Sequence, residues 1–583
     1  MKIEASTDFL NRFLTVLDDC VLNLPDHKAL GPSYTHEDFV PHDLALHRVK
    51  SKYDLPGSYD EKSLHAKALQ DFHTYDASLY GFRYTETDER QRSVLYRARL
   101  FCHKLMADFK VIDTDLDFSP GETFVSSQGK TSLYQKLNKL KNWTVTADAA
   151  EEFTYLVYRT RGLKRVAMRH IYRNASRSEL KNTWKTVIAD KRGIGYAVFA
   201  KLMSKHVLTI VLGSRMVTVY KNNRARRLIN IEPWGNVILQ RRRGLAIKRL
   251  LRSVGNDLTY GQEDHKVLIS NPENVTVDLR NASNSTATRS VEFMLPVSKF
   301  NSFNRVRSEF VFDGTDWCRP NLFSAMGNGF TFELMTLILL SVARVLDPDA
   351  RVYGDDIIIK SSVADEFIHA IKALGYGVNP EKTFIEGKFR ESCGAFFHGD
   401  FGYLKSFDLK RPNDLIEAII CVNKMYVLKD IHPWFRSTYK KVQSLFPALH
   451  KGPPPFQTYD DCRKLLTTYD EKEFLSHYVW ADTTGRTKHP AVRGVYNSID
   501  KTFADRLSIP NFEVIQGFKY SLEEASVCQG NLHTLNLSKL YYYIWSGRRT
   551  KDIIRNSNQV KSKLLIFYDG RTVDYNSLKT QTS

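Results

Sequence analysis

The feature that most constrains the fold of this chain is a Gly-Asp-Asp centre flanked by apolar residues. It is the string Tyr353-Gly354-Asp355-Asp356, preceded by Ala350-Arg351-Val352 and followed by Ile357-Ile358-Ile359. Short, largely β-branched runs on both sides of a glycine-containing turn are typical of a β-hairpin. We therefore expect two strands joined by a tight turn, with two carboxylates at its tip. Adjacent carboxylates repel each other unless a cation lies between them, so this hairpin is a candidate metal site, with a solvated surface hairpin as the alternative.

A second acidic segment is a separate β-branched run that ends in an aspartate. The segment Val275-Thr276-Val277-Asp278-Leu279 fits a buried strand that delivers one carboxylate. If folding pairs this strand with the hairpin, then Asp278, Asp355 and Asp356 converge. Three carboxylates suit Mg²⁺, with substrate phosphates completing the shell. Two such ions, with Mn²⁺ as an alternative, are what nucleotidyl transfer requires. The simpler interpretation of Asp278 is a cap of the following helix.

A glycine-containing loop lies between the two acidic segments. It runs Ser324-Ala325-Met326-Gly327-Asn328-Gly329-Phe330-Thr331 and precedes an apolar run over residues 332–345. Closely spaced glycines let a backbone approach a ligand, and the N-terminus of a helix favours anions. Ser324, Gly327 and Asn328 are therefore candidate nucleotide-binding residues, with Thr331 as a further donor. A small-residue turn before a buried helix is the alternative.

Basic residues dominate the charge of the chain. A net charge of +19 and a pI near 9.3 favour a polyanionic partner, above all nucleic acid. We expect strands over residues 201–211 and 216–220, an extended stretch over 221–231, and a helix with a cationic face over 240–253. In the extended stretch, Lys221, Arg224 and Arg227 are candidates to bind a triphosphate. The run Arg241-Arg242-Arg243 in the helix is either a solvated face or a non-specific RNA track.

One lysine follows the turn Gly375-Tyr376-Gly377-Val378-Asn379-Pro380. Lys382 is positioned to protonate a departing pyrophosphate if its pKa is lowered, which is a general-acid role. An exposed surface lysine without a catalytic role is the alternative.

Other features bear on the compartment. No apolar run reaches the length that spans a bilayer, and acids near the N-terminus, Glu4 and Asp8 among them, argue against a signal peptide. The seven cysteines are dispersed and contain no C-x-x-C pair. That pattern favours a reducing cytoplasm over a disulfide framework or structural zinc.

Taken in order, these segments resemble the replicase β subunits of small positive-strand RNA bacteriophages, the leviviruses of the Qβ and MS2 kind. The resemblance covers roughly residues 200–410. The strings that carry it are Lys221-Asn222-Asn223 with Arg227, Ile231-Glu232-Pro233, Val277-Asp278-Leu279, Met326-Gly327-Asn328-Gly329-Phe330-Thr331-Phe332-Glu333-Leu334, Tyr353-Gly354-Asp355-Asp356-Ile357-Ile358, Lys382-Thr383-Phe384 and Phe389-Arg390-Glu391-Ser392-Cys393-Gly394.

The resemblance implies an α+β, right-hand polymerase. We expect fingers and an N-terminal region over residues 1–265, a palm with an antiparallel sheet and helices over 266–404, and a mainly helical thumb and C-terminal region over 405–583. It implies an RNA-directed RNA polymerase that replicates a single-stranded phage genome in the cytoplasm of the infected bacterium and releases pyrophosphate. The implied partners are RNA template and product, nucleoside triphosphates, host elongation factors Tu and Ts and a host ribosomal RNA-binding protein, with no membrane.

Two positions depart from the family pattern. Asn284 stands where the family has Asp six residues after the first metal-binding Asp, so the position keeps a hydrogen-bond acceptor for a ribose hydroxyl but loses its charge. The segment over residues 259–270 is short and lacks the Asn-Gln-Arg of the family. A reverse transcriptase is the nearest alternative enzyme. A non-catalytic RNA-binding protein would account for the charge and for the aromatic, basic residues 541–549, but not for three separately placed acids.

Overall fold

The structure is a computed structural model, and it describes the part of the chain that carries the motifs. The described residues are 4–28, 40–56, 60–81, 84, 87–113, 115–118, 124, 136–137, 140–222, 225–413, 415–445, 451–452 and 478–479. They belong to two compact units, one of residues 1–29, 40–58 and 405–583, and one of residues 30–39 and 59–404. Arg224 and the aromatic, basic residues 541–549 lie outside the described residues.

The first unit is built from helices at both ends of its sequence. Its elements are α1 (Glu4–Leu22), α2 (Pro41–Lys52), α16 (Leu415–Leu428), α17 (Pro433–Gln443), β14 (Lys451–Gly452) and β15 (Tyr478–Val479). One apolar cluster joins α1 and α2 to α16 and α17, and Phe13 and Phe435 are fully buried in it. The Trp434 indole donates a hydrogen bond to the carbonyl of Cys20 at 3.0 Å. This packing of the N-terminal helices with the segment after residue 405 was not predicted from the sequence.

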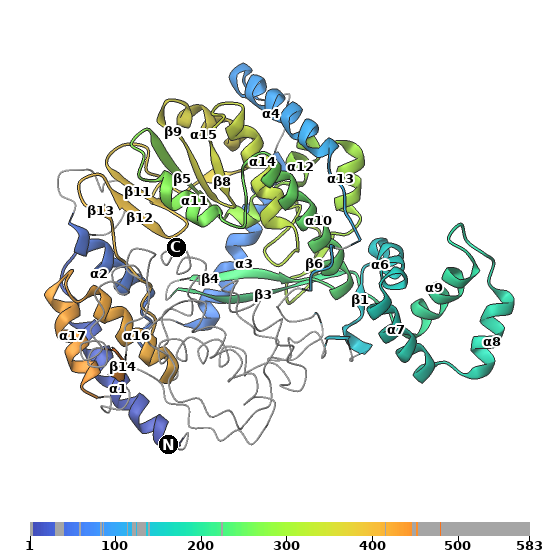
Figure 1. Cartoon of the computed structure of the whole chain (residues 1–583), viewed down its shortest axis with the longest axis horizontal. Coiled ribbons are helices and arrows are strands. Elements are labelled where there is room, and N and C mark those ends of the chain that lie inside the picture. The colour runs from blue at the N-terminus through green and yellow to red at the C-terminus, as the bar shows by residue number, and fades with distance from the viewer. Residues whose placement is uncertain are drawn as a thin grey trace, which may run out of the picture. The chain divides into compact units, whose positions relative to one another are not determined.

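The second unit contains the predicted catalytic segments (Figure 1). Its α-helices are α3 (Glu61–Ser78), α4 (Glu89–Ala107), α6 (Ala147–Arg159), α7 (Arg161–Asn174), α8 (Arg177–Thr186), α9 (Ile194–His206), α10 (Trp234–Ser253), α11 (Gly261–Leu268), α12 (Thr288–Met294), α13 (Val297–Asn304), α14 (Thr331–Arg344) and α15 (Ala364–Ala373). Short 3₁₀ turns are η1 (Leu79–Gly81), η3 (Leu140–Asn142), η4 (Ala282–Asn284) and η5 (Ser361–Val363).

The strands that the structure describes in this unit form four small sheets, and most of the pairs are antiparallel. They are β1 (Thr144–Val145), β2 (Thr209–Ile210), β3 (Gly213–Asn222), β4 (Ala225–Ile231), β5 (Asn274–Arg280), β6 (Phe310–Phe312), β7 (Trp317–Cys318), β8 (Arg351–Tyr353), β9 (Asp356–Lys360), β10 (Gly377–Val378), β11 (Phe389–Ser392), β12 (Ala395–His398) and β13 (Gly402–Tyr403). The sheet orders are β1-β2, β4-β3-β6-β7, β10-β5-β9-β8 and β11-β12-β13. The predicted α+β class is confirmed.

The sheet β10-β5-β9-β8 carries the acidic segments and is antiparallel throughout. Its central strands bury their β-branched residues, because Val275, Val277, Ile357 and Ile359 are almost completely inaccessible. Thr276 and Ile358, on the opposite face of these strands, are buried as well, so both faces of the sheet are covered. The predicted hairpin and the predicted strand before Asp278 are therefore neighbours in one sheet.

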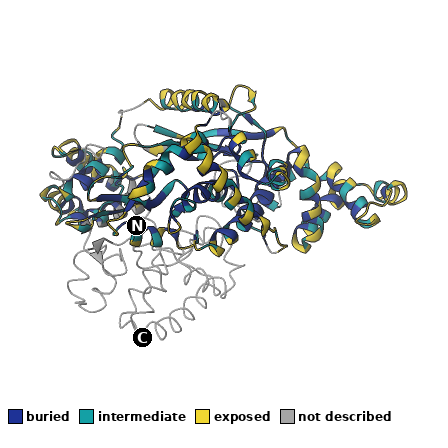
Figure 2. Ribbon diagram, turned by 90° about the horizontal axis from the view of Figure 1, so that it is seen from above, coloured by how far each residue is buried: buried dark blue, intermediate teal, exposed yellow. Residues whose placement is uncertain are grey.

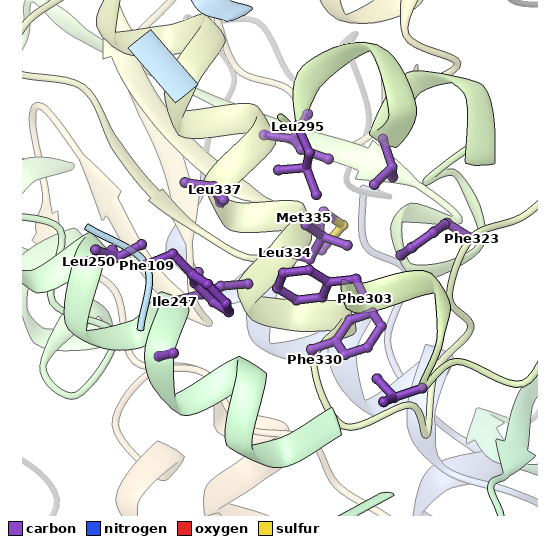
Figure 3. Packing of buried hydrophobic residues seen from close by; sticks show 14 of the residues in the cluster. Phe109, Ile247, Leu250, Leu295, Phe303, Phe323, Phe330, Leu334, Met335 and Leu337 are labelled. Carbon is purple, nitrogen blue, oxygen red and sulfur yellow. The ribbon is translucent and has the colours of Figure 1, made fainter. Parts of the chain in front are cut away.

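The main apolar core lies around α14, the helix that follows the glycine loop. Leu334, Leu337 and Ile338 are fully buried, and Met335 almost so. Figure 3 shows Phe303 and Phe330 packed beside this helix, with ring centroids 5.0 Å apart and an edge-to-face arrangement. Figure 2 shows how the buried residues continue through the sheets and helices of the unit. Because α14 is apolar nearly all round, it forms the rigid support of the neighbouring loop and hairpin.

One sequence prediction about secondary structure was wrong. Residues 201–211, expected as a strand, belong mainly to α9, and only Thr209–Ile210 form a strand. The buried residues Val198, Phe199, Leu202 and Met203 recur three and four positions apart, which is helical spacing. The predicted strand over 216–220 and the predicted helix over 240–253 are confirmed inside β3 and α10. Among the described helices, none is long and apolar enough to cross a membrane.

Candidate active site

The turn between β8 and β9 depends on a glycine. Tyr353 pairs with Asp356, which leaves Gly354 and Asp355 as the two central residues of the turn. Gly354 has a φ of 66°, and a Cβ atom there would lie 2.3 Å from the Phe332 ring. A positive φ at the first central position is typical of a type II′ turn, which matches the twist of a hairpin. The backbone N–H of Gly354 also donates to Thr336 Oγ1 at 3.0 Å, so α14 holds the tip in place.

The first acidic strand brings its carboxylate to this tip. In the β5–β9 pair Asp278 lies directly opposite Asp356, and directly opposed residues have Cα atoms about 5 Å apart. The side chain of Asp278 is 16% exposed and accepts a hydrogen bond from Asn379 Nδ2 at 2.9 Å. Its backbone N–H donates to Thr383 Oγ1 at 3.2 Å. Asp278 therefore does not cap a helix but sits in mid-sheet, beside the hairpin.

The pKa values of these carboxylates show that their surroundings contain too little positive charge. Burial raises the pKa of Asp278 to about 7; Lys382 and Asn379 oppose the rise, whereas Asp355 and Asp356 add to it. Burial likewise raises the pKa of Asp356 to about 6, with Asp355 contributing further. Desolvation and like charges both disfavour the ionised form. The protein groups around the pair do not balance its negative charge.

The donors fit divalent cations in chemical kind, because carboxylate oxygens are the ligands that Mg²⁺ prefers. As the side chains stand, however, no three His, Cys, Asp or Glu residues in the described part of the chain are grouped to hold a metal ion. Asn379 and Lys382 occupy the two carboxylate oxygens of Asp278. Binding of an ion between Asp278 and Asp356 therefore requires a rotation of these side chains, but no change of the strand register.

Lys382 lies at the site, in an environment that differs from the expected one. Its ammonium is 3.9 Å from Asp278 Oδ2 and 3.5 Å from Glu391 Oε1. Burial lowers the pKa of Lys382, but Glu391, Asp278 and Asp356 outweigh that effect, so the pKa is raised. The condition of a lowered pKa, which the sequence argument for a general acid required, is wrong in this state because three carboxylates face the ammonium.

Three residues of this site were missed by sequence reasoning. Asn379 binds Asp278, Glu391 binds Lys382, and Cys393 lies against Asp356. A hydrogen bond from the Cys393 backbone lowers the pKa of Asp356, against the larger effect of burial. Cys393 has a φ of 51° and is followed by Gly394 at 76°, in the turn between β11 and β12. Glu391 and Cys393 stand in one of the strings that carry the family resemblance, and Asn379 stands in the turn before Lys382.

The glycines of the loop before α14 lie against other parts of the protein and do not border an open space. Gly327 has a φ of 109°, and a Cβ atom there would lie 2.0 Å from the carbonyl oxygen of Asn230 in β4. A Cβ atom at Gly329 would lie 2.8 Å from the backbone nitrogen of Arg241 in α10. The hydroxyl of Thr331 donates to the carbonyl of Ala325 at 2.7 Å. The glycines thus let the loop pack closely on β4 and α10.

A buried polar network holds the same loop. Glu232 accepts hydrogen bonds from Ser308 Oγ at 2.5 Å and from Gln240 Nε2 at 3.1 Å. Gln240 Oε1 in turn accepts from the N–H of Gly329 at 3.0 Å. Burial raises the pKa of Glu232, although these hydrogen bonds oppose the rise. Ser324, the first residue of this loop, is buried, and its hydroxyl has no hydrogen-bond partner in the described part of the chain.

The other predicted nucleotide-binding residues lie on different elements. Lys221, at the end of β3, and Arg227, in β4, are exposed on neighbouring antiparallel strands of the sheet β4-β3-β6-β7. Arg224 lies outside the described residues. Asn284 is the last residue of the turn η4 after β5 and is partly buried. Asn281, just before this turn, has a φ of 50°. These positions remain predictions as nucleotide-binding residues.

The arginine run of α10 is neither a solvated face nor an RNA track. Arg241 is ion-paired with Asp117, and Arg243 makes two hydrogen bonds of 2.9 Å to the carboxylate of Glu152. Arg242 is 8% exposed, and its guanidinium donates to the carbonyls of Asp115 and Ile112. Both alternatives from the sequence are wrong for this run, because acids and carbonyls far away in the sequence enclose it.

A fold of this kind, with paired acids across an antiparallel sheet and a hairpin tip, agrees with the family comparison. Residues 64–448 match the family model described as RNA replicase, beta-chain. The match covers more than half of the 583-residue chain, so the chain belongs to the RNA replicase beta-chain family.

Curated relatives share the same region. The RNA-directed RNA polymerase beta chain of Escherichia phage MS2 is 35% identical over 234 residues, which are 39% of this chain and 42% of that protein. The RNA-directed RNA polymerase subunit beta of Escherichia virus Qbeta is 35% identical over 251 residues, 40% of this chain and 42% of that protein. The chain thus spans less than half of the length of these curated relatives.

Solved structures show weaker similarity. The RNA-dependent RNA polymerase of a human picorbirnavirus is 11% identical, with a TM-score of 0.30 over 40% of this chain and 56% of that chain. The Sicinivirus 3Dpol RNA dependent RNA polymerase is 15% identical, with a TM-score of 0.28 over 44% of this chain and 68% of that chain.

Proposed function

We propose that this protein is an RNA-directed RNA polymerase that copies a single-stranded RNA phage genome by metal-dependent nucleotidyl transfer. The observation that supports this proposal is the register of β5 and β9, which sets Asp278 opposite Asp356 at the tip of a Gly-Asp-Asp hairpin. Membership of the replicase family supports it independently. In the reaction, the 3′-hydroxyl of the nascent strand attacks the α-phosphate of a nucleoside triphosphate, and pyrophosphate leaves.

Each residue around the hairpin tip would have a separate role in this reaction. Asp278 and Asp355 would hold two Mg²⁺ ions, with Asp356 as the auxiliary carboxylate; when bound, the ions neutralise charge on the attacking and leaving oxygens. Asn379 and the β5 hydrogen bonds orient Asp278. Lys382 keeps its proton at neutral pH because its pKa is raised, so it adds positive charge beside the acids. Positioning and electrostatics would supply most of the acceleration.

The remaining predicted residues serve the nucleotide and the template. Lys221 and Arg227 would bind the triphosphate, together with Arg224, and Lys382 would donate a proton to pyrophosphate once substrate and ions have replaced its carboxylate partners. Asn284 would contact the ribose. The glycine loop, with Ser324, Gly327 and Asn328, would position the template and the incoming sugar. We propose host elongation factors Tu and Ts and a ribosomal RNA-binding protein as partners, and the cytoplasm of the infected bacterium as the location.

The decisive experiment replaces one carboxylate. Asp355→Asn removes a negative charge at the tip without changing the size of the side chain, and we expect template-dependent nucleotide incorporation to fall by on the order of a thousandfold or more. RNA binding, measured by filter retention, should stay within about twofold, because the hairpin acid is not a phosphate ligand. Asp316→Asn, at an exposed position, is the matched control. Full activity of Asp355→Asn with Mg²⁺ would remove the proposed site.

The choice between RNA and DNA synthesis is tested separately. An RNA template is offered with either ribonucleotides or deoxyribonucleotides, with and without EDTA. We expect incorporation of ribonucleotides only, and none in EDTA. Preferential incorporation of deoxyribonucleotides would identify a reverse transcriptase, and RNA binding without any incorporation would favour the non-catalytic alternative.

A further inference from the structure

A row of arginines follows one face of α7. Helices α6, α7 and α9 lie side by side in the second unit, and α8 packs against α9 (Figure 1). Residues three and four positions apart on a helix are neighbours on its surface. The row is formed by the exposed residues Arg161, Arg165, Arg169, Tyr172 and Arg173. The row is about 18 Å long, since an α-helix rises about 1.5 Å per residue.

The opposite face of α7 is fixed in the protein. Leu163, Ala167, His170 and Ile171 are buried, and α7 packs against α6 and α9. The imidazole Nε2 of His170 lies 2.9 Å from the carbonyl of Leu137. The exposed row is therefore held in one orientation by a well-packed helix rather than by a free segment.

The arginines of the row are not neutralised by the part of the protein that the structure describes. Arg161, Arg165, Arg169 and Arg173 have no ion pair, side-chain hydrogen bond or ring contact among the residues that the structure describes. No acid occurs in the sequence between Glu152 and Glu179. Glu179 itself is bound by Lys205 and His206 of α9. Like charges four residues apart destabilise a helix slightly, so the row is kept at a cost in stability.

The chemistry of the row favours RNA as its ligand. Guanidinium groups hold phosphate oxygens in pairs of hydrogen bonds and stay charged at all relevant pH values. Tyr172 stands within the row and is 63% exposed, and an exposed aromatic ring among cations is what single-stranded nucleic acid uses for base stacking. A membrane-surface helix would place its apolar face in lipid, whereas the apolar face of α7 is already buried in the protein.

We propose that the exposed face of α7 binds the backbone of single-stranded RNA at a site separate from the acidic hairpin, with Tyr172 stacking on a base. The choice of RNA among polyanions rests on the proposed function. The site would hold template or product outside the place where nucleotides are joined. Its loss should weaken RNA binding without changing the chemical step on a short template at saturating concentration.

The experiment uses the full chain and a labelled, unstructured single-stranded RNA, with affinity measured over a range of salt concentrations. The α7 variant carries Arg161→Gln, Arg165→Gln, Arg169→Gln and Arg173→Gln. Loss of four phosphate contacts should lower the slope of log affinity against log salt by about 3 and weaken binding about tenfold or more. The control variant removes the same formal charge at exposed positions elsewhere: Arg92→Gln, Lys104→Gln, Lys110→Gln and Lys372→Gln. The control should change the affinity by about twofold at most.

Several outcomes would overturn the proposal. Equal losses in the two variants would show a general effect of net charge, and unchanged binding in the α7 variant would show that the row does not contact RNA. Loss of a co-purifying protein, with RNA affinity unchanged, would assign the row to a protein partner. Circular dichroism and urea unfolding of both variants establish that they fold alike. If the unaltered chain binds RNA but incorporates no nucleotides, the proposed function fails while the binding comparison still decides the role of α7.

Tyr172 tests the single-strand assignment by itself. Tyr172→Ala should weaken binding of single-stranded RNA about fivefold or more, because base stacking on an aromatic ring is lost. Tyr172→Phe keeps the ring and should bind as the unaltered chain does. The affinity for duplex RNA, whose bases are already stacked, should be the same in both variants. An unchanged single-strand affinity in Tyr172→Ala would contradict the proposal.

Discussion

Two helices of the same unit, α7 and α10, are both rich in arginine and use it in opposite ways. In α10, Arg241 and Arg243 meet Asp117 and Glu152, and Arg249 makes hydrogen bonds to Asp115. In α7 the arginines face outward, and none has an ionic partner among the described residues. Figure 2 shows exposed and buried residues alternating along the helices of this unit. Arginine therefore forms ion pairs within the protein in α10, whereas in α7 it is exposed and can bind a ligand.

The difference between α7 and α10 shows that a run of arginines in the sequence does not reveal whether its side chains are ion-paired within the protein or exposed on its surface. The acids that neutralise α10 come from positions 91 to 134 residues away in the sequence. Among the residues that the structure describes, the arginines of α7 have no such partners, and their charges repel each other. Charges with partners should cost stability when removed. Charges kept without partners, or buried against like charges, should cost binding or catalysis when removed, and their removal should leave stability unchanged or improve it. Three substitutions test this comparison, from the largest expected effect to the smallest.

The largest effect is expected for a paired arginine. Arg243 has a side chain that is 5% exposed, and it holds Glu152 with two hydrogen bonds. Arg243→Gln leaves the carboxylate of Glu152 without its partner, and removing one member of a buried pair costs about 3 kcal/mol. Urea unfolding measures the loss. Arg165→Gln, the same substitution at an exposed position of α7, is the control and should change the free energy of unfolding by about 0.5 kcal/mol at most. Equal effects at the two positions would end the comparison.

A smaller effect of opposite sign is expected for an acid of the hairpin site. Burial raises the pKa of Asp278 to about 7, above its usual value of 3.8. The folded state therefore binds more protons than the unfolded state between these values, so ionisation destabilises the fold fully above pH 7 and not at all below pH 3.8. In EDTA at pH 8, Asp278→Asn should raise the free energy of unfolding by about 2 kcal/mol, because the neutral amide leaves no buried charge to desolvate.

The stabilisation by Asp278→Asn should shrink as the pH falls towards 4, which a series of urea unfolding curves would reveal. Asp316→Asn, at an exposed position, should show no such trend. Nucleotide incorporation by Asp278→Asn should be lost at every pH. A variant that is less stable than the unaltered chain above pH 7 would contradict the view that this charge is kept against stability.

The outcome for single residues shows how far sequence reasoning reaches. The hairpin around Gly354 is encoded locally, by β-branched runs and a turn glycine, and was predictable. The partners of Asp278 and Asp356 were not, because Asn379 and Cys393 arrive through strand pairing and turns whose register the sequence does not reveal. The segment 201–211 was assigned wrongly because a short apolar run fits a strand and a buried helix equally. The fate of Arg243 depended on a carboxylate on another helix.

The smallest change in stability is expected for Arg169→Glu in α7, where stability and RNA affinity should change in opposite directions. In Arg169→Glu, the new carboxylate stands four residues from Arg165 and four from Arg173, so two repulsive pairs become attractive ones. Each such pair contributes about 0.2–0.5 kcal/mol, and glutamate before a cation is the favourable order. The variant should therefore unfold at slightly higher urea concentration, by about 0.5 kcal/mol, while its affinity for single-stranded RNA falls more than that of Arg169→Gln. If the arginines of α7 do not bind RNA, Arg169→Glu should gain stability and keep its RNA affinity. If they do bind RNA, the same variant should gain stability and lose affinity, so the two measurements together distinguish these cases.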